Sequence, residues 1–281
     1  MKKLVLSFIT LFIGLTLTAQ VTISAKEFAA LQKSNKSLVV VDATKASTYA
    51  RMHIMRSINI PYAELNKSGD IAGLIKDPET IAAYLGKKGI SNDSEIVVYD
   101  EGSNKYSSRV YWVLKYVGAK NVKILHKDMS QWKSARLRLT KSPTPVKPAT
   151  FTAEVNPAIY AAISEVKAGL NKSNVVIVDC RAANEFDGSI ESSKGHIPGA
   201  VHMEYKDVLK ANGAFKSKVE LNALAEKFGL TADKTIIVYC ATSVRAAVSY
   251  IAFKDILGLD NVKVFDGAYN EWVADASNKV D

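Results

Sequence analysis

The sequence predicts an α/β protein that contains the same domain twice, and three observations support this fold class. Segments 89–100 and 229–240 share one pattern, a glycine, a polar turn and an apolar strand that ends in tyrosine: GISNDSEIVVYD and GLTADKTIIVYC. The offset of 140 residues then persists without a gap as far as Trp132 and Trp272. In each copy, short β-branched runs alternate with amphipathic helical patterns. A duplicated domain explains these features better than one large fold.

The N-terminus has the composition of a secretory signal peptide. Lys2 and Lys3 precede an uncharged apolar run from Leu4 to Ala19, which is shorter than the roughly 20 residues of a membrane span. We expect residues 1–20 to be removed on export, which makes the protein periplasmic or secreted and leaves it no stable membrane anchor. Without the two lysines, 35 basic residues face 28 acidic ones. This surplus suits a small anionic ligand, and no basic run of the kind that binds nucleic acid is present.

The strand patterns of each copy indicate a parallel sheet. LVVVD (38–42) and EIVVYD (95–100) correspond to VVIVDC (175–180) and TIIVYC (235–240). These runs are continuously apolar and are separated by helical patterns such as DPETIAAYLGKKG and VELNALAEKFG. We therefore expect a central, mainly parallel sheet with helices on both faces. Ligands of such sheets bind beyond the carboxyl ends of the strands.

A proline-rich segment separates the two copies. LTKSPTPVKPATF contains three prolines within six residues, and proline disfavours helix in the residue before it. We therefore expect a first domain at 21–140, a linker at 141–150 and a second domain at 151–281.

Cys240 opens the segment CATSVR at the carboxyl end of a predicted strand. If the next helix begins near Arg245, the backbone N–H groups of the turn converge on the sulfur and can stabilise an anion there. Thr242 and Ser243 can add hydroxyl donors, and Arg245 adds a fixed positive charge. A small buried cysteine that only packs is the alternative interpretation.

These motifs resemble the rhodanese (sulfurtransferase) family in its tandem-domain form. The resemblance covers nearly all of the mature chain and is carried by four segments: VDCR…NEF (178–186), GHIPGAVHMEY (195–205), IIVYCATSVRA (236–246) and VFDGAYNEW (264–272). It implies two rhodanese-like domains. It also implies that Cys240 takes a sulfane sulfur from a small anionic donor such as thiosulfate, holds it as a persulfide, and passes it to cyanide or a thiol.

The resemblance also implies roles for further residues of the second domain. Arg181 and the loop residues would bind the donor, with Asp179 and His196 in support; the loop residues are Ala241, Thr242, Ser243, Val244 and Arg245. Arg181 and Asp179 have an equally valid alternative role, which is to fix the loop. Asp266 and Trp272 are expected to serve the turn and the packing, and His196 to make a fixed hydrogen bond.

Several positions depart from the family patterns. Ser243 and Arg245 stand where two-domain members usually have glycine and threonine, and Ala241 fits neither donor-selective pattern, so the donor stays open. Glu185 stands where mercaptopyruvate enzymes tend to carry a second arginine, which argues against mercaptopyruvate. Asp100 occupies the position of Cys240 in the first domain. Because a carboxylate cannot form a persulfide, we expect that domain to be catalytically silent and to wall the cleft of the second.

Other functions fit parts of the pattern. A cysteine-dependent phosphatase or arsenate reductase uses a similar loop, but related phosphatases place one residue more between cysteine and arginine. A non-catalytic binding or sulfur-relay module would share the fold. The four histidines are not clustered, so we expect no metal and no cofactor, and we expect a monomer. Cys180 should point away from the side that Asp179 uses. This favours a buried, unreactive thiol, and a bridge to Cys240 is the alternative.

Overall fold

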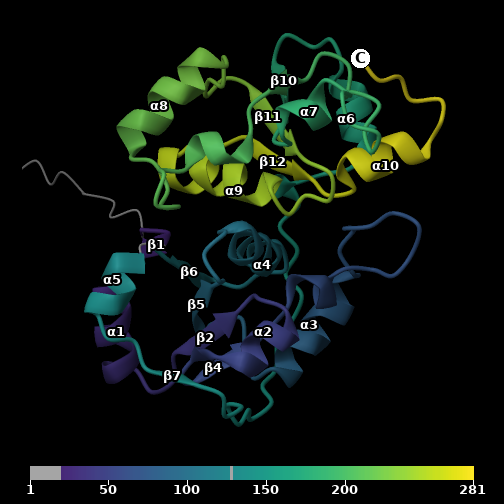
Figure 1. Cartoon of the computed structure of the whole chain (residues 1–281). Coiled ribbons are helices and arrows are strands. Elements are labelled where there is room, and N and C mark those ends of the chain that lie inside the picture. Colours follow the sequence, from purple (N-terminus) through teal and green to yellow (C-terminus); the bar gives the residue numbers. More distant parts are fainter. Residues whose placement is uncertain (1–19, 127–128) are drawn as a thin grey trace, which may run out of the picture.

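A computed structural model describes residues 20–126 and 129–281, which form two α/β domains (Figure 1). Apart from Gln20, the predicted signal peptide lies outside the described residues. Within the described ranges, no helix is long and apolar enough to cross a membrane.

Five parallel strands form the sheet of the first domain, in the order β1-β6-β5-β2-β4. These strands are β1 (Thr22–Ile23), β2 (Val39–Asp42), β4 (Ser57–Asn59), β5 (Glu95–Tyr99) and β6 (Asn121–Leu125). A small antiparallel pair joins β3 (His53–Ile54) to β7 (Leu139–Thr140). The helices of this domain are α1 (Ala25–Ser34), α2 (Ala46–Arg51), α3 (Pro78–Lys87), α4 (Lys105–Tyr116) and α5 (Met129–Ser134).

The second domain repeats this topology, with a parallel sheet in the order β8-β12-β11-β9-β10 when it is read from the matching edge. Its strands are β8 (Tyr160–Ala161), β9 (Val175–Asp179), β10 (Val201–His202), β11 (Thr235–Tyr239) and β12 (Val262–Phe265). Its helices are α6 (Ile163–Gly169), α7 (Ala183–Phe186), α8 (Lys218–Lys227), α9 (Ala246–Tyr250) and α10 (Ala268–Ala274). The predicted fold class of two parallel-sheet domains is confirmed.

Local sequence explains where the main helices begin. Ser217 and Glu220 form a capping box at the start of α8, in which each side chain bonds the backbone N–H of the other residue. Ser24 and Glu27 do the same for α1. Pro78 is the first residue of α3, where its missing N–H costs no helical hydrogen bond.

Strand register brings the ends of paired strands together. Tyr99 lies opposite Asp42 in the first domain, and Tyr239 lies opposite Asp179 in the second. The residues that follow these pairs therefore leave the sheet side by side at its carboxyl edge. Asp100 and Cys240 are two of these residues.

The two domains share one hydrophobic interior. In Figure 1, α4 lies between the two sheets, directly beside α9. Buried side chains of both helices, including Trp112 and Val248, belong to one core cluster. The helix of α9 continues as a π-helix over Ile251–Leu257. Between Thr140 and Pro157, the described chain has no helix or strand, and it passes along the first domain before it enters the second.

Candidate active site

Cys240 is the first residue after β11 and is fully buried. Its carbonyl oxygen accepts a hydrogen bond from the Tyr269 N–H at 2.9 Å, and the carbonyl oxygen of Ala241 accepts one from Asn270 N–H at 3.3 Å. Both donors lie at the start of α10. The segment that follows β12 therefore binds the backbone of the cysteine loop. This contact explains why the sequence signature around Asp266 accompanies the cysteine loop.

Ser243 has a left-handed backbone, with a φ of +61°, at the loop position where glycine was expected. Such a conformation is unfavourable for a residue with a Cβ atom. The Ser243 hydroxyl donates a hydrogen bond to the Phe265 carbonyl oxygen, and the side chain is fully buried. The prediction that this hydroxyl faces the ligand is wrong, because the hydroxyl is needed to hold the strained turn.

The corresponding loop of the first domain shows what the loop amides can do. The buried Asp100 carboxylate accepts four backbone N–H hydrogen bonds at 2.7–3.2 Å, and hydroxyl bonds from Ser103 and Ser107. The four amides belong to Gly102, Asn104, Tyr106 and Ser107. A loop of this type is therefore an anion cradle, and in the first domain its own carboxylate fills it.

The offset of 140 residues places a corresponding loop after β11, although its left-handed residue is Ser243, whereas the first loop is left-handed at Gly102 and Asn104. The counterparts of the first three donors are the N–H groups of Thr242, Val244 and Ala246, and none of these donates to another group within residues 20–126 and 129–281. The fourth counterpart, Ala247, donates to the Ser243 carbonyl oxygen at 3.2 Å. Three N–H donors of this loop thus remain for an anion that binds beside it.

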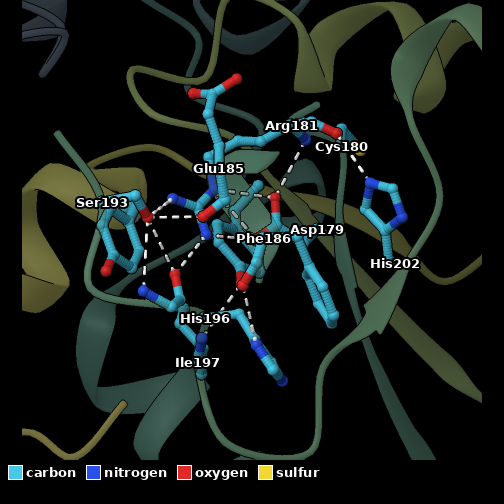
Figure 2. Close-up of polar contacts among 12 residues, drawn as sticks. Asp179, Cys180, Arg181, Glu185, Phe186, Ser193, His196, Ile197 and His202 are labelled. Carbon is cyan, nitrogen blue, oxygen red and sulfur yellow. Dashed lines mark hydrogen bonds and ion pairs between the residues drawn. The ribbon is translucent and has the colours of Figure 1, made fainter. Parts of the chain in front are cut away.

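Arg181 does not point its charge at the loop. Its guanidinium contacts the Asp179 carboxylate through Nε and Nη2 at 2.6–3.0 Å, and it also donates to the Ser193 hydroxyl and the Gly195 carbonyl oxygen (Figure 2). The side chain is 1% exposed and stacks on Tyr269 at 3.8 Å. Of the two roles left open for Arg181, this geometry argues against binding a donor; its direct contacts hold the segment 193–195 and Tyr269, whose N–H donates to the Cys240 carbonyl oxygen.

Arg245 is the cation that interacts with Cys240. Burial lowers its pKa, but hydrogen bonds with Glu185 and the electrostatic interactions with Cys240 and Glu185 outweigh this effect and raise the pKa. Glu185 binds the guanidinium through both carboxylate oxygens, at 2.5 and 2.7 Å. The charge of Arg245 was expected from the sequence, but its partner was not, because 60 residues separate the two.

Cys180 is buried and free, as is Cys240. Its Sγ lies 3.9 Å from the Val178 carbonyl oxygen, and burial raises the pKa of its thiol. The side chain points away from the side of Asp179, as strand alternation predicts. Cys240 follows β11 at the position that Cys180 has after β9, so the same alternation of side chains applies to both cysteines. The two residues therefore belong to the same core cluster, and their sulfurs interact electrostatically.

His196 and Trp272 have structural contacts. His196 stacks on Phe186 with ring centroids 3.7 Å apart, and its Nδ1 lies 3.1 Å from the Phe186 carbonyl oxygen (Figure 2). The buried Trp272 donates through Nε1 to the Lys279 carbonyl oxygen at 2.8 Å. Both agree with the structural roles expected for these residues.

Asp266 does more than shape a turn. Its carboxylate accepts a hydrogen bond from Arg109 at 2.6 Å and one from the Ile75 N–H at 3.0 Å, and both donors belong to the first domain. The ion pair is 0% and 1% exposed. Asp266 was expected to serve the turn and the packing; the structure adds that it joins the first domain to the segment that contacts the cysteine loop.

Each domain places a loop over the cysteine position of the other. A Cβ atom on Gly73 would lie 2.8 Å from Thr242, so the backbone at Gly73 packs closely against the Cys240 loop. The symmetric contact runs from the Asn104 side chain to the Gly213 carbonyl oxygen at 2.5 Å. Gly73 and Gly213 are 140 residues apart, so the repeat contained a signal for this contact that sequence reasoning missed.

A cavity of about 720 Å³ lies elsewhere and contains none of the predicted site residues; its lining includes Tyr111, Lys115 and Asp255.

Fold and site together define a tandem α/β protein with a cysteine-centred anion cradle in one domain and a carboxylate in the cradle of the other.

Comparison with known proteins places this architecture in a family. The sequence profile of the rhodanese-like domain matches residues 24–135 and 162–275. The chain therefore belongs to the rhodanese family and carries the rhodanese-like domain twice, as the motifs predicted.

Several relatives match over most of their length. The 3-mercaptopyruvate sulfurtransferase of Escherichia coli K12 is 29% identical over 246 residues, which cover 85% of this chain and 87% of the relative. A protein of Synechococcus elongatus, provisionally named as a thiosulfate sulfurtransferase, is 30% identical over 92% of this chain and 85% of its own. The crystal structure of SseA from Escherichia coli, a 3-mercaptopyruvate sulfurtransferase, has a TM-score of 0.80 and 27% identity, covering 89% of this chain and 99% of that one.

Proposed function

We propose that Cys240 carries the transferred sulfur as a persulfide. The chain is a sulfurtransferase of the rhodanese family, and Cys240 is the cysteine that stands in the anion cradle. The observation that carries the assignment is the pair of corresponding loops: the Asp100 carboxylate accepts the backbone N–H groups of one, and the other has Cys240 in the place of Asp100 and three N–H groups that donate to no group among the described residues.

The proposed reaction has two steps. The Cys240 thiolate attacks the outer sulfur of a donor such as thiosulfate, a new sulfur–sulfur bond forms, and sulfite leaves with the electron pair of the broken bond. The acceptor, cyanide or a thiolate, then attacks the outer sulfur of the persulfide and restores the thiolate. The amides of Thr242, Val244 and Ala246 stabilise the persulfide anion in between, and Arg245 adds its positive charge.

Intact-mass measurement tests this proposal. The mature protein incubated with thiosulfate should gain about 32 Da, the mass of one sulfur atom, and lose it again on addition of cyanide. Cys240→Ser should form no adduct and turn over at least about 1000-fold more slowly, because a serine oxygen cannot hold a sulfane sulfur. Cys180→Ser is the matched control and should retain the adduct. An adduct on the Cys240→Ser variant would refute the assignment.

A sulfur-relay role is the second candidate. It is supported by the sulfur carrier protein TtuD of Thermus thermophilus, which is 30% identical over 69% of this chain. In a relay, the persulfide would form but would pass only to a protein thiol. A protein that is loaded by thiosulfate and unloaded by neither cyanide nor small thiols would favour the relay.

We also propose that the chain is exported and works as a monomer. The proposal is supported by the Lys-Lys start and the short apolar run of residues 1–20. The mass of the protein recovered from the periplasm or the medium should begin after Ala19 or Gln20, and its native mass should equal one chain. Recovery of the full chain in the cytoplasmic fraction would contradict export.

A further inference from the structure

The ion pair between Glu185 and Arg245 places a carboxylate at the mouth of the Cys240 loop. Both Glu185 oxygens contact the guanidinium, and the two side chains are 21% and 22% exposed. Arg245 is the sixth residue of the loop and interacts with the Cys240 sulfur. The cation nearest to the reacting atom is therefore already neutralised by a residue of its own domain.

Glu185 is held in this position by the backbone. Its Oε2 accepts the Ala182 N–H at 3.1 Å at the start of α7. The Arg245 hydrogen bonds lower the pKa of the carboxyl group, so it is ionised at neutral pH. Figure 2 shows that this carboxylate points away from the network of Arg181 and Asp179. The Glu185 carboxylate therefore pairs with Arg245 of the cysteine loop and not with Arg181.

Two further cations, Arg181 and Lys206, interact electrostatically with this pair, and each is already paired with another carboxylate. Arg181 is buried against Asp179. Lys206 interacts electrostatically with Arg245, but its side chain is 67% exposed and already paired with Glu204 at 2.9 Å. Exposed charges of this kind are strongly screened by salt. The cation that interacts with Cys240 is thus paired with the Glu185 carboxylate, which leaves the loop amides as the donors for an anion.

We infer that Glu185 sets the charge class of the sulfur donor. It favours persulfides R–S–SH whose R group carries no negative charge over donors with a sulfonate or carboxylate next to the transferred sulfur. The inference rests on the proposed function, since it concerns the donor that loads Cys240.

The chemical step is the same for both donor classes. The Cys240 thiolate attacks the outer sulfur of R–S–SH, the new sulfur–sulfur bond forms, and the old one breaks. The R–S⁻ leaving group takes the electron pair, and the persulfide proton stays on the transferred sulfur. With thiosulfate, the leaving group is instead the sulfite dianion. Glu185 therefore acts on the leaving group and not on the sulfur that is transferred, and it is a positioning and selectivity residue.

Donor competition in the full mature protein tests the inference. The probes are thiosulfate and the persulfide of cysteamine, whose amine is protonated at neutral pH, with one acceptor at a fixed concentration. Glu185→Gln keeps the shape of the side chain and removes its charge. The ratio of kcat/KM for thiosulfate to kcat/KM for the persulfide should rise about 10- to 100-fold, as expected for one charge removed at short range in a partly buried site. The rise should shrink at high ionic strength.

Glu165→Gln is the matched control. Glu165 also pairs with a basic residue, Lys263, at 2.6 Å, but it lies on α6 rather than at the loop. This variant loses the same charge and should leave the donor ratio within about twofold. Glu185→Ala provides a second test, because removal of the charge by truncation should move the ratio in the same direction.

Three results separate the possible failures. An unchanged donor ratio in a folded Glu185→Gln variant would overturn the inference, and so would an equal loss with both donors, which would reduce Glu185 to a support for Arg245. A wild-type protein that gains no sulfur from either donor would instead overturn the proposed function, and the inference with it.

Discussion

Replacing Arg109 with methionine tests the buried ion pair between the domains. Methionine keeps most of the apolar volume beside Trp112, over whose ring the guanidinium lies at 4.8 Å. The change leaves the Asp266 carboxylate buried, with the Ile75 N–H as its remaining donor among the hydrogen bonds described above. Removing one partner of a buried pair costs about 3–5 kcal/mol. Since whole proteins are stable by about 5–15 kcal/mol, this loss is large.

Urea unfolding of the mature chain, followed by tryptophan fluorescence, measures the effect. The midpoint should fall by the equivalent of about 3–5 kcal/mol, and the melting temperature by about 6–15 °C. The double variant Arg109→Met/Asp266→Asn removes the isolated charge, so it should be more stable than Arg109→Met alone. A single variant within about 1 kcal/mol of the wild type would refute the reasoning, because it would mean that the carboxylate is satisfied in some other way.

Three further results are expected. Gly73→Ala should lower sulfurtransferase activity about 10-fold, since its Cβ would clash with Thr242 and its φ is +103°; Gly69→Ala, which also has a positive φ but open space around it, should retain activity. Asp100→Ala should lower the free energy of unfolding by about 2–4 kcal/mol, because four backbone N–H groups lose their acceptor, while the variant should still form the persulfide. Thiol titration of the native protein should reveal one fast thiol that is lost in Cys240→Ser. No free thiol, with a mass about 2 Da below the reduced form, would instead show a bridge to Cys180.

Sequence alone predicted the sheets and the main helices because their signals are local. The apolar runs of β5 and β11 and the helical patterns of α3 and α8 can be read without knowing what they pack against. Cys240 and its loop followed from the same logic, since a residue at the carboxyl end of a parallel strand faces a ligand site.

The contacts that sequence reasoning missed are those between distant residues. Arg109 and Asp266 are 157 positions apart, and Arg245 and Glu185 are 60 apart. In each case the residue type was visible but its partner depended on how elements pack. Ser243 illustrates a different difficulty. A hydroxyl near an anion site suggests a ligand contact, but in the left-handed conformation of Ser243 the hydroxyl donates to the Phe265 carbonyl oxygen.

Because the Asp100 carboxylate occupies the loop of the first domain, the two loops differ in whether their anion can be exchanged. In the folded chain, the N–H groups of the Asp100 loop already donate to a carboxylate of the loop itself, which is covalently fixed and cannot be exchanged. Under the proposed function, the Cys240 loop alternates between a loaded and an unloaded state at every turnover, so its amides gain and lose a bound anion each time. Duplication has thus produced one loop that holds a fixed internal anion and one loop whose N–H groups are open to an exchangeable anion.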